Sequence, residues 1–118
     1  MPWAEPIIAC LRAGERVRLR PRGNSMTPRI RSGEAIALAP CEGEPRPGDA
    51  VLCRVRGSCY VHLVKAIQGH GDARRFLIGN NHGGLNGWIP RRLIFGVVVA
   101  VGEAAVAELL GDESQREK

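Results

Sequence analysis

The chain has 118 residues, an ordinary apolar content and a formal net charge of +5. This length suffices for one domain with a modest core, and no apolar run approaches the ~20 residues that span a bilayer. The composition therefore excludes a disordered chain and a membrane span. Fifteen glycines and eight prolines indicate many turns, so we expect short strands rather than long helices.

The first expected elements are a short helix and a half-exposed strand. The helix falls within Trp3–Gly14, where Pro6 fits the first turn and Gly14 ends it. After it comes "R-V-R-L-R-P-R-G", in which apolar residues alternate with arginines up to Pro21 and Gly23. This alternation predicts a strand with one exposed face.

The rest of the chain alternates short strands with turns rich in Gly and Pro. We expect strands at about 35–39, 50–56, 59–67, 75–78 and 93–101, with a long Gly-rich loop at 79–87. The last strand is apolar on both faces, which predicts a central, buried position. A helix follows at Glu103–Leu110. We therefore expect a mostly β single domain over residues 1–110 and a solvated tail at residues 111–118.

The positive charge comes mainly from arginines that recur along the chain, as in Arg16, Arg18, Arg20 and Arg22. Such a surface suits nucleic acid, anionic lipid or acidic partners, and it also serves simply to keep a protein dissolved. Because no aromatic residues interleave with the arginines as a base-stacking platform requires, we favour the solubilising role over a nucleic-acid partner.

The cysteines show neither a C-x-x-C pair nor a metal-binding spacing. They are Cys10, Cys41, Cys53 and Cys59. Cys59 and His62 lie three residues apart on a predicted strand, so their side chains point to opposite faces and would not bind one ion. We expect reduced thiols in a cytoplasmic protein, with no metal and no cofactor.

The stretch "G-N-S-M-T-P-R-I", residues 23–30, contains a candidate nucleophile, Ser25. A serine hydroxyl is a poor nucleophile until a base takes its proton. The candidate bases in the middle of a predicted strand are His62 and Lys65, which lie on opposite faces, so only one of them can meet Ser25. A lone histidine on a strand is also common as a structural residue, and the local pattern leaves both roles open.

Five sequence boxes occur in a fixed order: "G-N-S-M-T-P-R-I-R-S-G-E", "P-G-D-A-V-L", "Y-V-H-L-V-K", "F-L-I-G-N-N" and "F-G-V-V-V-A-V". The series resembles the signal peptidase I and LexA-like serine peptidases from about Arg16 to Gly102. The resemblance implies coiled antiparallel sheets and a peptidase that acts on a peptide or protein substrate. We also expect this chain to lack the membrane anchor and the DNA-binding domain that members of the family carry.

Carried over box by box, the resemblance implies that Ser25 is the nucleophile and His62 the general base. The base is Lys in the bacterial signal peptidases and LexA, and His in the endoplasmic-reticulum and archaeal type, whose V-H-R-V is similar to "V-H-L-V" here. The Ser25 N–H is expected to help form an oxyanion hole. The residues that we assign to the substrate cleft are Gly23, Asn24, Met26 and Pro28.

This chain departs from the family pattern at the acidic residue. "G-N-N" stands where the His-type enzymes read G-D-N, so Asn80 replaces an Asp. Asn80 is then expected to hold the His62 ring through its amide oxygen without supplying a charge, and the alternative is that it serves only as a turn residue in the Gly-rich loop. A second acidic position falls near Leu85 or Asn86, which also lack a carboxylate.

Three functions stay open at this point. The first is a serine endopeptidase with a Ser25–His62 dyad that cuts a short extended segment with small side chains beside the bond. The second is a catalytically silent module that binds a peptide or protein partner, as the missing acid suggests. The third is a nucleic-acid-associated regulator that uses the arginine surface. Exposed sheet edges also leave a homodimer open.

Overall fold

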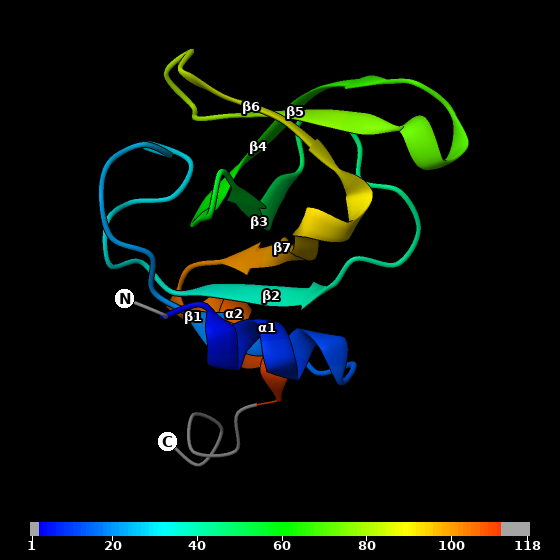
Figure 1. The fold of residues 1–118 in the computed structure, drawn as a ribbon. Coiled ribbons are helices and arrows are strands. Elements are labelled where there is room, and N and C mark those ends of the chain that lie inside the picture. The colour runs from blue at the N-terminus through cyan, green and yellow to red at the C-terminus, as the bar shows by residue number, and fades with distance from the viewer. Residues whose placement is uncertain (1–2, 112–118) are drawn as a thin grey trace.

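The computed structural model describes residues 3–111 (Figure 1). Within this range the strands form one antiparallel sheet in the order β1-β2-β7-β3-β4-β5-β6. The elements are α1 (Glu5–Arg12), β1 (Val17–Leu19), β2 (Ile36–Pro40), β3 (Ala50–Val55), β4 (Ser58–Gln68), the 3-10 helix η1 (Gly71–Ala73), β5 (Arg75–Gly79), β6 (Leu85–Pro90), the 3-10 helix η2 (Arg91–Leu93), β7 (Ile94–Val101) and α2 (Glu103–Leu110). The mostly β fold with an N-terminal helix is therefore confirmed. Of the expected tail at residues 111–118, all but Gly111 lies outside the described residues.

The two helices cover the β1–β2–β7 part of the sheet, and the β5–β6 hairpin lies at the far side of the molecule (Figure 1). Helix α1 buries Ile8 and Leu11 in a cluster that includes Leu38 of β2. Helix α2 buries Val106 in a separate cluster with Ala37 of β2. The strands β3 to β6 enclose a third cluster, which includes Phe76 and Ile78 of β5. Burial of these aliphatic side chains is the main stabilising contribution to the fold.

Helix α1 approaches β7 closely at Gly96. A Cβ atom there would lie 2.8 Å from Leu11 Cδ1 and 2.9 Å from the carbonyl oxygen of Ala39. Any side chain would push the helix away from the sheet, so this contact requires glycine. Within the described residues, neither helix has the length and apolar character needed to cross a bilayer.

Strand β7 lies between β2 and β3, as its apolar sequence predicts, but only its first half is fully buried. Its ladder with β3 ends at the pair Val51–Val97, whereas its ladder with β2 continues to Val101. The second half of β7 therefore has a neighbour on one side only, and Val99 is 45% exposed.

The sequence did not predict strand β6, because a loop was expected over residues 79–87. The loop between β5 and β6 is shorter and spans residues 80–84. Asn86 and Gly87 have low strand propensity, but the ladder with β5 and the burial of Ile89 hold the segment in the sheet.

Candidate active site

Ser25 lies on an irregular segment, residues 20–35, that connects β1 and β2. The segment bends at residues 23–30, where Met26 and Ile30 are buried in the same core as helix α1. The base of the segment is closed by a hydrogen bond from Gly33 N–H to the Pro21 carbonyl, at 2.7 Å. Gly23 has φ +104°, a backbone conformation that favours glycine. The bend therefore buries its apolar side chains and leaves Ser25 half-buried beside the sheet.

The β5–β6 loop supports the bend from a second direction. Asn81 donates its backbone N–H to the Ser25 carbonyl at 2.9 Å and its side-chain Nδ2–H to the Thr27 carbonyl at 3.1 Å. His82 Nε2 lies 3.0 Å from the Asn24 carbonyl, to which it donates. Two residues of one loop thus fix the carbonyls of Asn24, Ser25 and Thr27.

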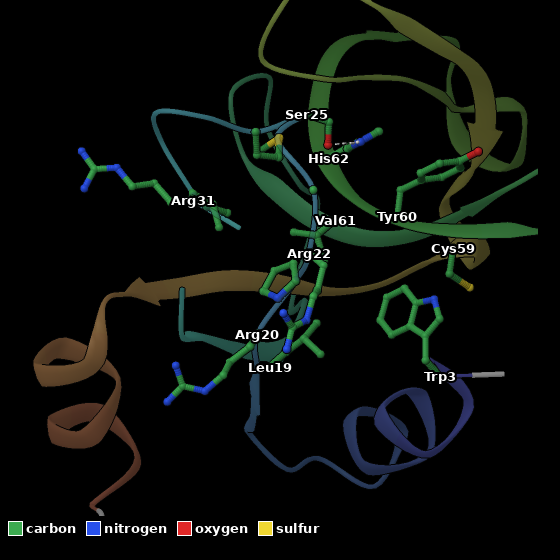
Figure 2. A pocket seen from close by; sticks show the side chains of 14 residues that line it. Trp3, Leu19, Arg20, Arg22, Ser25, Arg31, Cys59, Tyr60, Val61 and His62 are labelled. Atoms are coloured by element: carbon green, nitrogen blue, oxygen red, sulfur yellow. Dashed lines mark hydrogen bonds between the residues drawn. The ribbon is translucent and has the colours of Figure 1, made fainter. Parts of the chain in front are cut away.

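His62 extends from β4 toward Ser25 (Figure 2). Its Nε2 lies 3.0 Å from Ser25 Oγ. The Tyr60 ring stacks on the imidazole at a centroid distance of 4.8 Å, and only 7% of His62 is exposed. This burial lowers the pKa of His62 below its ordinary value of 6.5, with a smaller opposing effect from the hydrogen bond to Asn86. The ring is therefore neutral at pH 7.

Asn86 of β6 sets the tautomer of the imidazole. Its amide oxygen lies 2.7 Å from His62 Nδ1. Since an amide oxygen only accepts hydrogen bonds, Nδ1 carries the proton and donates it. The lone pair of Nε2 is then free to accept the hydroxyl hydrogen of Ser25. A general base needs this tautomer.

The expectation that Asn80 holds His62 is wrong. The Asn80 side-chain oxygen accepts hydrogen bonds from the backbone N–H groups of His82 and Gly84, at 2.8 and 2.9 Å. These bonds cap the tight turn between β5 and β6, so the amide faces its own loop. The partner of His62 is Asn86, one of the two residues near which the second acidic position was expected. Lys65, the other candidate base, lays its side chain against Gly79.

A cleft of about 360 Å³ opens beside Ser25 and His62 (Figure 2). Residues 19–23 of β1 and its continuation line one part of it, and residues 59–62 of β4 line another. Of the residues expected to bind substrate, Gly23 and Met26 line the cleft. Asn24 and Pro28 are not among its lining residues.

The four cysteines are free thiols. Between residues 3 and 111, no three His, Cys, Asp or Glu side chains gather closely enough to hold a metal ion. Burial raises the pKa of Cys53 to about 12, so this thiol is protonated at neutral pH. Of the four thiols, that of Cys59 belongs to a residue that lines the cleft beside Ser25 and His62.

Comparison with known families gives one match, the model described as Peptidase S24-like, over residues 1–84. The chain belongs to the Peptidase S24-like family. The match supports a place in the wider LexA and signal peptidase superfamily, and it spans both Ser25 and His62. Asn86 and β6 lie beyond the part of this Peptidase S24-like chain that the family model covers. Among curated proteins, none matches the chain significantly.

Proposed function

We propose that this chain is a serine endopeptidase in which Ser25 is the nucleophile and His62 the general base. The observation that carries the proposal is the continuous hydrogen-bonded series Asn86 Oδ1–His62 Nδ1 and His62 Nε2–Ser25 Oγ, at 2.7 and 3.0 Å, beside an open cleft. A nucleophile in contact with a base that a third group orients is the arrangement that acyl transfer requires.

In the first half-reaction, His62 Nε2 takes the hydroxyl proton as Ser25 Oγ attacks the substrate carbonyl carbon. The imidazolium then gives that proton to the leaving amine as the peptide bond breaks, which leaves an acyl group on Ser25. Water hydrolyses this ester with His62 again as the base. Asn86 accepts the Nδ1 hydrogen bond throughout, so the ring keeps one orientation.

The oxygen of the tetrahedral intermediate needs a hydrogen-bond donor. The backbone N–H of Ser25 donates to no other group in residues 3–111, so it is free for this purpose. Backbone donors on a bend that packing and hydrogen bonds already fix lose little freedom when the intermediate forms.

The substrate binds as an extended segment. The ladder between β4 and β5 begins at Leu63, so residues 58–62 pair with β3 alone and have a second backbone edge beside the cleft. An added strand can use this edge for backbone hydrogen bonds. Met26, Ile30 and Val61 line the cleft and leave shallow apolar space, which fits small side chains next to the cut bond.

A histidine in the position of the base supports the further proposal that the site is of the Ser-His type, as in the endoplasmic-reticulum and archaeal signal peptidases. The neutral partner Asn86 favours a second candidate, a peptidase fold that binds a peptide without cutting it. An uncharged amide orients the ring but stabilises the imidazolium less than a carboxylate does.

A peptide library read by mass spectrometry tests the proposal. The native chain is incubated with extended peptides that carry small residues, and Ser25→Ala is the control. We expect cleavage products that appear with the native chain and vanish with Ser25→Ala. If neither protein cuts but both bind the peptides, the silent-module function takes its place.

A further inference from the structure

The cleft beside Ser25 is lined by positive charge on one side. Three arginines contribute to it, Arg20, Arg22 and Arg31, and no Asp or Glu of the described chain is among the lining residues. The apolar side chains Leu19, Met26 and Ile30 line the same space. The cleft therefore combines an apolar floor with guanidinium groups, and its preferred ligand must satisfy both.

The three arginines differ in whether their charge is already neutralised. The Arg20 guanidinium forms an ion pair with Glu103 and donates to the Gly33 carbonyl. Arg22 and Arg31 are exposed, and within residues 3–111 neither guanidinium makes a hydrogen bond or an ion pair. Glu34, close to Arg31 in sequence, directs its carboxylate to the Arg31 backbone N–H instead. Figure 2 shows the Arg31 side chain extending away from Ser25 and His62, so the Arg22 charge is the one available to a ligand in the cleft.

Side-chain alternation along β1 and its continuation shows how a peptide would meet these charges. Leu19 and Pro21 are half-buried, whereas Arg20 and Arg22 are exposed. A peptide strand beside this segment alternates in the same way, with side chains directed in turn toward the apolar floor and toward the arginines. Opposite charges on neighbouring strands stabilise each other.

We propose that the cleft selects acidic peptide segments, with small residues at the inward positions and Asp or Glu at the alternate, outward positions. Arg22 is the residue that determines this preference. The proposal rests on the proposed function for the placement of the peptide in the cleft. It adds the chemical class of the substrate, which the Ser25–His62 pair by itself does not specify.

The test uses binding, so it does not depend on catalysis. The full-length Ser25→Ala chain is titrated into fluorescently labelled extended peptides that have Ala at inward positions and Glu, Gln or Lys at outward positions. Fluorescence anisotropy gives the Kd. We expect the Glu peptide to bind about threefold more tightly than the Gln peptide, and the Lys peptide most weakly, with differences that shrink as salt rises.

Arginine variants in the Ser25→Ala background locate the effect. We expect Arg22→Gln to weaken Glu-peptide binding about threefold and to leave Gln-peptide binding unchanged, whereas Arg31→Gln should have a smaller effect because its side chain extends away from Ser25 and His62. Arg92→Gln is the matched control, because Arg92 is exposed on η2 and does not line the cleft. Arg22→Glu should reverse the preference toward the Lys peptide. Circular dichroism checks that each variant is folded.

Four results would overturn the proposal. They are equal binding of the Glu and Gln peptides, no binding of any peptide, an equal effect of Arg92→Gln, and displacement of the Glu peptide by an oligonucleotide of the same charge at equal concentration. The outcomes also separate this proposal from the proposed function. Cleavage without a preference for acidic peptides contradicts only the proposed substrate class. A preference for acidic peptides without cleavage by the native chain contradicts only the proposed peptidase activity.

Discussion

The two reacting groups of the site are held by different kinds of structure. His62 lies within β4, where the pair Val51–His62 belongs to the ladder with β3 and the Tyr60 ring covers the imidazole. Ser25 lies on a segment without helix or strand. Burial of Met26 and hydrogen bonds from Asn81 hold this segment in place. The base is thus positioned by a sheet, and the nucleophile by packing plus contacts from a distant loop.

This difference indicates where the site is sensitive to change. A strand with many ladder partners tolerates the loss of one polar contact, because the remaining hydrogen bonds keep its backbone in place. An irregular segment depends on a few specific bonds. The position of the Ser25 hydroxyl therefore depends on the β5–β6 hairpin. Asn81 of this hairpin donates to the Ser25 carbonyl, and Asn86 accepts from His62.

Removal of either reacting group should have the largest effect. We expect Ser25→Ala and His62→Ala each to lower kcat/KM by about 10³-fold or more, and the double variant to be no worse than either alone, because the two act as a unit. Steady-state kinetics on one cleaved peptide measures this. Independent, multiplying losses would show that the two residues do not share one proton transfer.

Asn86→Asp should strengthen the base. A carboxylate beside Nδ1 stabilises the imidazolium that forms during attack, so we expect kcat/KM to rise about tenfold or more, within the range general-base catalysis supplies. The charge also raises the pKa of His62, so the gain should be present above that pKa and fade as the pH falls through it. Asn80→Asp is the matched control and should give no gain. A gain from Asn80→Asp alone would contradict the assignment.

Asn81→Ala tests the support of the nucleophile. It removes the side-chain bond to the Thr27 carbonyl and keeps the backbone bond to Ser25, so we expect kcat/KM to fall about tenfold through misplacement of the hydroxyl. Stability should change little. Asn80→Ala removes two bonds within its own turn and should lower the free energy of unfolding by about 1–2 kcal/mol. Unchanged kinetics in Asn81→Ala would show that packing alone holds the bend.

The smallest expected effect is a pH dependence of stability from His62. Burial lowers its folded-state pKa below 6.5, so the unfolded chain binds the proton more readily. This contribution to stability is fully present above about pH 6.5 and is lost as the pH falls toward the folded-state pKa. Denaturant unfolding between pH 5 and 7.5 measures it. We expect His62→Ala to show a shallower decline than the native chain, and an equal decline would contradict the assignment.

Local patterns in the sequence were enough for most strands and the two helices, whereas the Ser25–His62 pair was implied by the resemblance to a known family. Alternating Arg and aliphatic residues specify the face of β1, and the order of the five boxes placed Ser25 and His62 in one site, where the structure finds them 3.0 Å apart. The faces of the strands depend on side-chain period, which can be read along a single chain.

Only the tertiary structure decided the partner of His62 and the support of Ser25. Both come from the β5–β6 hairpin, whose second strand has loop-like residues at Asn86 and Gly87. The ladder with β5, including a register shift between Ile78 and Gly79, determines that Asn86 reaches the imidazole while Asn80 caps the turn. A register is set by pairing between strands and by buried residues such as Ile89, so no local pattern in the sequence specifies it.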